Sequence, residues 1–267
     1  MNRRVHELQQ QAVQTMHTTI EEAGRFLRWA ASALVVGTIV GGLIGLFRMA
    51  VSWAVQMRAA HPAILFALPL AGAAIVWLYH CCGLDTDPGT DHILRSVRAD
   101  PGVHLRMAPL VAVSTVLTHL CGGSSGRMGA ALQIGGSVSG VLGHWANMDE
   151  KDSHIITMCG MAAGFSALFG TPLAAAVFAM EVVSVGEMYY AAFFPCLFSA
   201  FSAFLVTGAM GLSADAYQVV SVPDISAVSV LQVVLLGIGC ALVARLFCAA
   251  LRMARRAYGA VFPDTGF

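Results

Sequence analysis

Charged residues are scarce in this sequence of 267 residues. Lys, Arg, Asp and Glu together make up 11% of the chain, whereas 57% of the residues are apolar or aromatic. About a quarter of an ordinary soluble domain is charged, so a soluble protein is excluded. Basic and acidic residues balance at 15 each. Because no excess of positive charge exists, nucleic acid is not an expected partner.

The motifs of enzymes and cofactor proteins are also missing. The sequence has no HExxH pattern, no Ser/His/Asp arrangement typical of hydrolases, and no Gly-Lys-Ser/Thr ending to a glycine-rich loop. We therefore expect no catalytic residue, no metal site and no cofactor. The cysteines lack the short paired spacings of metal sites and are expected to pack as small apolar residues, with a redox role for Cys81 and Cys82 as the alternative. They are Cys81, Cys82, Cys121, Cys159, Cys196, Cys240 and Cys248.

Long uncharged runs are what the sequence has in abundance. About 20 apolar residues, rising 1.5 Å each, cross a hydrocarbon core roughly 30 Å thick. Seven uncharged runs reach 19 residues or more, which predicts an all-α integral membrane protein that crosses the cell membrane several times. They cover 29–47, 59–84, 107–126, 128–148, 153–180, 188–214 and 225–244.

Arginine placement predicts the orientation of the chain. Four arginines precede the first span and only Arg58 follows it, so the positive-inside rule places the N-terminus in the cytoplasm. The second span, at about 63–81, then returns, and the polar segment 85–106 lies on the cytoplasmic side. Residues 1–24 are polar with apolar positions at three- and four-residue steps, which predicts an amphipathic helix on the cytoplasmic face or in the membrane interface.

Glycine and serine are concentrated at 122–126, where five small residues follow one another. Helix propensity is low there, so we expect a broken helix at a transport site, since irregular backbone at membrane depth is tolerated where it is buried or lines a cavity. For the later glycines, close helix packing through the pairs Gly136/Gly140 and Gly160/Gly164 is an equal alternative. The charged segment 149–152 is expected to be a solvated loop, with Asp152 or Ser153 capping the next helix.

A weak internal repeat relates residues 34–54 to residues 234–254. The alignment matches Gly37 with Gly237 and Phe47 with Phe247, among five identities. Arginines lie before the first of these helices and after the second. By the positive-inside rule the two helices run in opposite directions, which predicts an inverted repeat.

The run Gly-Ser-Ser-Gly-Arg at 123–127 is expected to open a helix within the membrane. Backbone N–H groups at a helix start, together with the positive end of the helix dipole, bind anions without a full positive charge. Partial charges of this kind allow an ion to enter and leave again. The sequence therefore predicts an anion site at this helix start.

Two stretches resemble the CLC family of chloride channels and anion/proton antiporters. Residues 122–136, Gly-Gly-Ser-Ser-Gly-Arg-Met-Gly-Ala-Ala-Leu-Gln-Ile-Gly-Gly, are similar to its Gly-Arg-Glu-Gly-Pro signature. Residues 162–181, from Ala162 to Glu181, are similar to its second conserved stretch. The likeness extends weakly over about 25–258. Thr118-His119-Leu120 together with Gly122-Gly123-Ser124 is most similar to the prokaryotic branch with fluoride/proton antiporters.

The resemblance implies broken, tilted helices in two inverted halves, a homodimer, and chloride or fluoride as the ligand. Residues 25–212 would be the first half of the transmembrane domain, and 225–258 the first helix of the second. A family loop at the central anion site would fall on 87–90. The anion-binding residues carried over from the family are Ser125, Gly126, Arg127, Met128, Gly129, Gly89 and Thr90.

Departures from the family pattern change the expected mechanism. The signature glutamate, which gates the pathway and carries the proton, is replaced by Met128, and methionine cannot lose a charge. Val182 stands where many antiporters have an inner glutamate. Glu181 and His119 are the remaining candidates for a proton-linked role, although each is as well explained by a helix-end contact. We therefore expect anion flux that is uncoupled from protons.

The rest of the second half is absent from the sequence. The chain is therefore expected to be a fragment, a split subunit that pairs with another membrane chain, or a non-conducting remnant, because a single chain would expose pore-lining polar groups to lipid.

Overall fold

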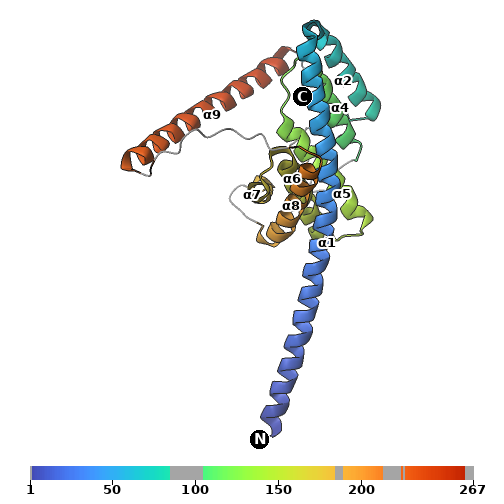
Figure 1. The fold of residues 1–267 in the computed structure, drawn as a ribbon, viewed down its shortest axis with the longest axis vertical. Helices are drawn as coiled ribbons and strands as arrows, with labels where there is room; N and C mark the ends of the chain where they lie inside the picture. The colour runs from blue at the N-terminus through green and yellow to red at the C-terminus, as the bar shows by residue number, and fades with distance from the viewer. Residues whose placement is uncertain (1, 85–104, 184–188, 213–223, 225, 262–267) are drawn as a thin grey trace. The chain divides into compact units, whose positions relative to one another are not determined.

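A computed structural model describes residues 2–84, 105–183, 189–212, 224 and 226–261 (Figure 1). Every regular element in these ranges is helical, which confirms the all-α prediction. The chain forms two units, Met1–Asp215 and Ala216–Phe267. The first contains α1 (Asn2–Ala60), η1 (Pro62–Ala67), α2 (Leu68–Cys82), α4 (Met107–Leu120), α5 (Arg127–Trp145), α6 (Glu150–Phe169), α7 (Pro172–Val183), η2 (Tyr190–Ala192) and α8 (Phe193–Ala209). The second contains α9 (Ala227–Val261).

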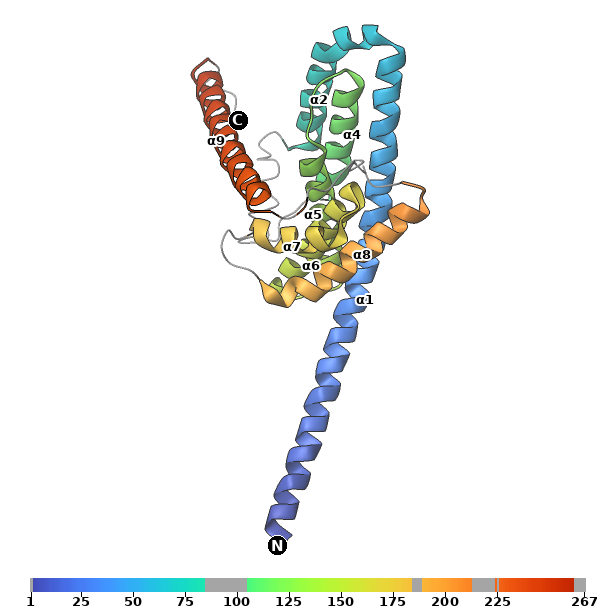
Figure 2. The same cartoon turned by 60° about the vertical axis from the view of Figure 1, so that its left-hand side comes forward.

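The long helix α1 packs along the first unit through one apolar stripe. Its buried side chains recur every three or four residues, which is the period of one helix face. This face lies against α8, α6 and α4 (Figure 2). Residues 2–24 are helical and continuous with the span, and the position of this segment on the membrane surface stays a prediction. The stripe consists of Ala33, Val36, Val40, Ile44, Phe47 and Val51.

Four helices are long and apolar enough to cross a bilayer among the described residues. They are Phe26–Ala60, Pro62–Cys82, Tyr190–Ala209 and Ala227–Ala260. The second corresponds to the span expected at 63–81. Helix α4, with 14 residues, rises only about 21 Å, and α7, with 12, about 18 Å, which is less than the roughly 30 Å of the hydrocarbon core. Neither helix is long enough to cross this core alone.

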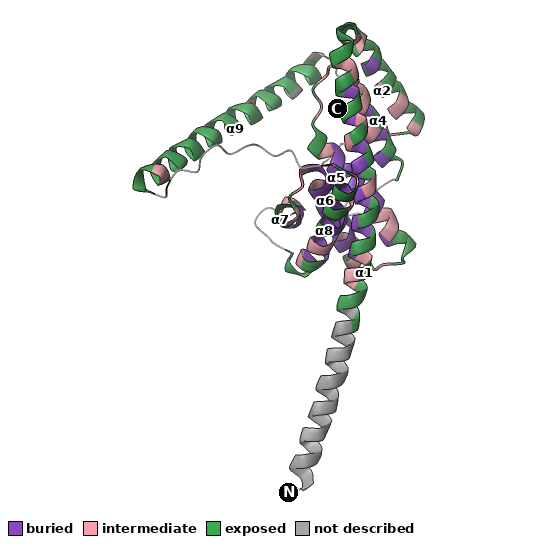
Figure 3. Cartoon of the chain, in the orientation of Figure 1, coloured by how far each residue is buried: buried purple, intermediate pink, exposed green. Residues whose placement is uncertain are grey.

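Helices α5, α6 and α8 form the buried core of the first unit (Figure 3). Both α5 and α6 are buried over most of their surface, as expected of a helix that is surrounded by others. Serine side chains join α6 to α8: Ser166 Oγ donates to the Ala200 carbonyl oxygen at 2.7 Å, and Ser199 Oγ donates to the Cys159 carbonyl oxygen at 3.0 Å. Such bonds hold membrane helices together where lipid offers no competing partner.

The start of α6 differs from the sequence expectation. Asp149 occupies the N-cap position, with φ −61° and ψ 162°, and Glu150 to Asp152 already belong to the helix. The prediction of a solvated loop at 149–152 with a cap at Asp152 or Ser153 is therefore wrong by one turn. Glu150 and Asp152 lie in the first turn, where negative side chains stabilise the positive end of the helix dipole.

Helix α9 forms the regular part of the second unit. Its 35 residues begin at Ala227, and the Ser226 hydroxyl accepts a hydrogen bond of 3.2 Å from the Ser229 N–H. This contact satisfies one of the N–H groups that the first turn of a helix leaves open. The length of α9 agrees with the helix expected over 225–258, and its direction relative to α1 stays a prediction.

Candidate functional site

The glycine cluster at 122–126 separates two helices, as its composition predicts. Helix α4 ends at Leu120, and the Gly122 N–H donates to the His119 carbonyl oxygen at 3.2 Å. The Gly123 N–H donates to the Thr118 carbonyl oxygen at 2.8 Å. This pair of bonds is the Schellman ending of a helix, and it requires a left-handed residue, which Gly122 supplies with φ +83°.

Helix α5 begins at Arg127, so the predicted helix start is confirmed. Gly126 is its N-cap residue, with extended φ −68° and ψ 123°, and has no side chain to cap the helix. The N–H groups of the first turn have no partner within the helix. Arg127 and Met128 are exposed, with 37% of Met128 accessible, and Gly129 is half-buried. These groups can therefore meet an ion at the helix start.

A half-buried arginine, Arg58, lies beside this break, and sequence reasoning did not predict this proximity. Arg58 is in the last turn of α1, and its Nη1 would lie 3.9 Å from a Cβ built on Gly122. A Cβ built on Gly122 would meet Leu65 of η1, and one built on Gly123 would meet Leu68 of α2, so the turn after α1 covers the end of α4. A positive charge is thereby held next to the segment that leads into α5.

Close packing against α6 holds α5 in place. A Cβ built on Gly164 would lie 2.5 Å from the Ala131 carbonyl oxygen, and a Cβ built on Gly160 would overlap the Gly135 carbonyl oxygen. Ser139 Oγ donates back to the Gly135 carbonyl oxygen at 2.7 Å. The predicted packing role of Gly160 and Gly164 is thus confirmed, with Gly135 as the glycine of α5 that meets them.

An arginine within the first span contacts the end of α6. Arg48 Nη1 donates a hydrogen bond of 3.0 Å to the carbonyl oxygen of Ala167. This carbonyl lies in the last turn of α6, where the helix dipole is negative and a cation is stabilising. Gly170 and Thr171 then lead directly into α7. Arg48 therefore fixes the turn in the second stretch that resembles the CLC family.

The two candidates for proton linkage lie on different helices. His119 is in the last turn of α4, and its Nδ1 is 2.8 Å from the Thr115 carbonyl oxygen, so it makes the helix-end contact considered as the alternative. Glu181 is exposed near the end of α7, which packs against α6 and α8. Gly89 and Thr90, from the expected central loop, lie outside the described residues.

Within the described ranges, no three His, Cys, Asp or Glu side chains gather as a metal site would require. The seven cysteines are unpaired by disulfides, and Cys121, Cys159 and Cys196 are buried. The chemistry that this site offers is electrostatic, through backbone dipoles and nearby guanidinium groups.

Comparison with known proteins finds similar sequences among chloride and fluoride transport proteins. The profile described as "Voltage gated chloride channel" matches residues 71–263. A chloride/fluoride channel protein of Pseudomonas syringae pv. tomato is 39% identical over 225 residues, which cover 84% of this chain and 50% of that protein. The H(+)/Cl(−) exchange transporter ClcA of Salmonella arizonae is 31% identical over 170 residues, covering 56% and 35%.

Solved structures resemble this fold as well. A CLC-type fluoride/proton antiporter aligns with a TM-score of 0.84 and 30% identity, covering 90% of this chain and 61% of that one. A slow cyanobacterial Cl−/H+ antiporter aligns with a TM-score of 0.57 and 26% identity, covering 70% and 48%. The chain spans about half the length of the curated relative that it matches over 225 residues.

Proposed function

This chain belongs to the voltage-gated chloride channel family, or CLC family, and on that premise we propose that it takes part in moving chloride or fluoride across the cell membrane without coupling to protons. The observation that carries the proposal is the start of α5. There an exposed helix N-terminus follows a glycine break, and the first turn carries Met128, which the resemblance to the CLC signature aligns with the gating glutamate.

The start of α5 supports anion binding through partial charges. The N–H groups of Arg127, Met128 and Gly129 point out of the helix start, and the dipole adds the equivalent of about half a positive charge. The N-cap residue, Gly126, has no side chain that could occupy this end of the helix. An ion held by dipoles is released more readily than one paired with a full charge, which suits a transport pathway.

Nearby guanidinium groups support recruitment of the anion. Arg58 lies beside Gly122, and Arg127 is exposed at the first position of α5. Charges of one sign around an opening raise the local concentration of the opposite ion, and the effect weakens as salt screens them. In this proposal the two arginines attract the anion and the α5 amides bind it, while Gly89 and Thr90 contribute further along the path.

Uncoupled flux is proposed because neither remaining candidate replaces the glutamate. The His119 ring contacts its own helix through Thr115, and Glu181 lies on α7 rather than at the start of α5. Met128 has no ionisable group.

The orientation that we propose places the N-terminus in the cytoplasm, so the start of α5 faces the outside of the cell.

Association with another membrane chain is the second candidate function. The chain matches half of the length of its relative, and α8 exposes large apolar side chains along one side. Phe194 is 55% exposed, Phe201 45% and Leu205 66%, at spacings that share a helix face. This face suits a second copy, giving a homodimer, or a chain that supplies the other half of the transport domain.

Efflux from liposomes separates the two candidates. The purified chain is reconstituted with internal potassium chloride or potassium fluoride, and valinomycin carries the compensating potassium while an ion-selective electrode records the anion. Efflux above that of empty liposomes, increased by Met128→Ala, is expected for transport through this site. Met49→Ala is the matched control, because Met49 is exposed on α1 away from the break. Efflux equal to that of empty liposomes, with dimers detected by cross-linking, favours the association role.

A further inference from the structure

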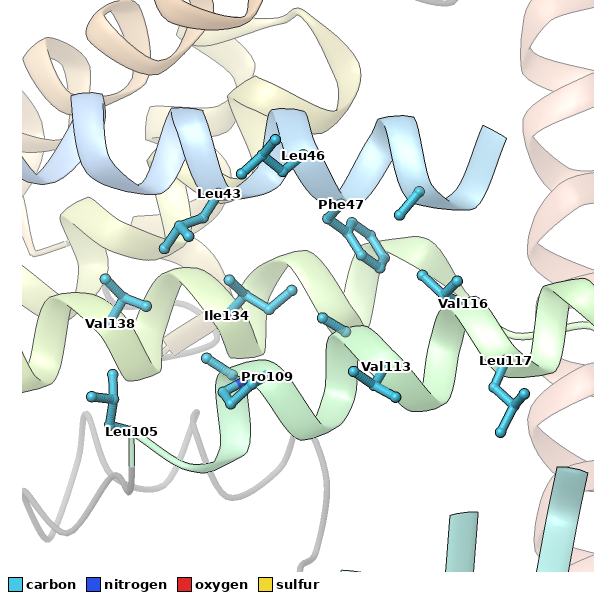
Figure 4. A pocket seen from close by; sticks show the side chains of 13 residues that line it. Leu43, Leu46, Phe47, Leu105, Pro109, Val113, Val116, Leu117, Ile134 and Val138 are labelled. Atoms are coloured by element: carbon cyan, nitrogen blue, oxygen red, sulfur yellow. The ribbon is translucent and has the colours of Figure 1, made fainter. Parts of the chain in front are cut away.

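An apolar groove of about 640 Å³ lies between α1, α4 and α5 (Figure 4). Leu43, Leu46 and Phe47 of α1 form one wall, Val113 and Leu117 belong to α4, and Ile134 comes from α5. Every side chain that lines it is apolar. Leu46 is 59% exposed and Val113 53% exposed, so the groove opens to the surroundings of the helices.

An apolar groove of this kind does not hold ordered water, which requires polar partners. If it stayed empty, its walls would lose the dispersion contacts that a filled groove provides. In a membrane, the acyl chains of the surrounding lipids are available to fill such a groove. Figure 4 shows Leu105, which precedes α4, at one end of the groove and Leu117 of α4 at the other. The helical part of this wall, from Met107 to Leu117, rises about 15 Å, which matches the roughly 15 Å depth of one leaflet.

The lining fits a flexible chain better than another helix. Helices that pack closely in membranes meet through small residues, as α5 and α6 do here through Gly135 and Gly160. The walls of the groove carry mainly Leu, Val, Ile and Phe side chains, which keep a second helix backbone at a distance. An acyl chain has no backbone that must approach closely, and it can follow the contour between these side chains.

A positive charge marks one end of the groove. Arg106 is exposed and directly follows Leu105, the lining residue at that end. Among the described residues 105–120, Arg106 is the only arginine or lysine, and no Asp or Glu is present. A phosphate at this end would therefore meet a guanidinium group, which pairs well with phosphate oxygens.

We propose that this groove binds a membrane phospholipid, with one acyl chain between α1, α4 and α5 and the phosphate at Arg106. The hydrocarbon supplies most of the affinity because it fills the groove. The guanidinium group selects lipids that carry a phosphate. This site is separate from the start of α5, so the proposal does not depend on anion transport.

Native mass spectrometry of the full chain, released from detergent micelles, tests the proposal. The probes are phosphatidylglycerol and diacylglycerol with the same acyl chains. We expect the wild-type chain to retain about one phosphatidylglycerol. Ala112→Phe and Ala50→Phe fill the groove from opposite walls, and each lowers retention roughly tenfold, since each methylene displaced from an apolar site weakens binding about fourfold. Two variants on separate helices guard against a folding defect in one of them.

Headgroup dependence and a matched control complete the test. Arg106→Gln is expected to lower phosphatidylglycerol retention to the level of diacylglycerol, which lacks the phosphate. Ala74→Phe adds the same ring to an exposed position on α2, outside the groove, and is expected to retain lipid like the wild type. Equal retention by Ala112→Phe, Ala50→Phe and Ala74→Phe would overturn the proposal. Loss of cross-linked dimers in the groove variants, without a change in bound lipid, would instead assign the groove to a second copy.

Discussion

Gly135 of α5 and Gly160 of α6 face each other with their backbones in direct contact, so that a Cβ on either one would overlap the carbonyl group of the other. This contact lies about two turns below Arg127, at which α5 begins. Because the two helices cannot slide or separate without losing it, the contact fixes the position of the helix start that we propose as the anion site.

Substitution of Gly160 by Ala is expected to destabilise the fold. The added methyl group has to push α5 away, and overpacking of this kind costs about 1–3 kcal/mol. The free energy of unfolding in mixed micelles measures the loss. Gly42→Ala is the control, because a Cβ at Gly42 meets nothing within 4 Å. If the two variants unfold alike, the close contact does not hold α5 in place.

Removing the charge of Arg48 is expected to loosen the turn between α6 and α7. Arg48→Met breaks the 3.0 Å bond to Ala167, and hydrogen bonds to charged groups contribute about 1.5–3 kcal/mol. Hydrogen exchange at residues 168–174 is expected to rise, with partial rescue by Arg48→Lys. Gln56→Leu, an exposed change on the same helix, serves as the control. Unchanged exchange in Arg48→Met would show that the bond does not order the turn.

Neutralising Arg58 is expected to reduce anion flux when salt is low. Arg58→Gln removes the charge beside Gly122, and the loss is expected to be a few-fold at about 10 mM salt, where the screening length is roughly 30 Å. At about 1 M salt the variant and the wild type should converge. Arg58→Lys restores the flux, and Arg28→Gln at the other end of the span leaves it unchanged. A salt-independent defect would argue against electrostatic recruitment.

Introducing a carboxyl group at position 128 is expected to make the flux depend on pH. An ordinary glutamate has a pKa of about 4.3, so Met128→Glu is ionised at neutral pH and competes with the anion for the α5 amides. Acid protonates the group and frees the site. Flux through Met128→Glu should therefore rise as the pH falls from 7 to 4.5, whereas that of the wild type stays level. Identical pH profiles would mean that position 128 does not face the anion.

The sequence predicted the local features that depend on residue type. Five small residues at 122–126 interrupt the helix, and Gly160 with Gly164 provides a surface for close packing. Both effects follow from the absence of a large side chain, which lowers helix propensity and lets backbones approach in any fold. The partner of that surface is Gly135, whereas the sequence pairs were Gly136/Gly140 and Gly160/Gly164. Which glycine meets another helix depends on rotation about the helix axis, and sequence spacing does not determine this.

Long-range placement of charged residues could not be predicted. In the sequence, Arg58 indicates only the topology of the chain. In the structure it lies beside Gly122, which is 64 positions later in the chain. Arg48 likewise contacts Ala167, which is 119 positions away. Both contacts follow from how α1 packs against α4 and α6. No local pattern around either arginine encodes that packing.

Simultaneous recording of anion and proton movement tests the central claim most directly. Liposomes containing the purified chain are given a chloride or fluoride gradient, with an ion-selective electrode for the anion and a pH-sensitive dye for protons. The account predicts anion efflux that Met128→Ala increases, with no proton movement driven by the anion gradient. Proton movement that the gradient drives and that Glu181→Gln abolishes would contradict it.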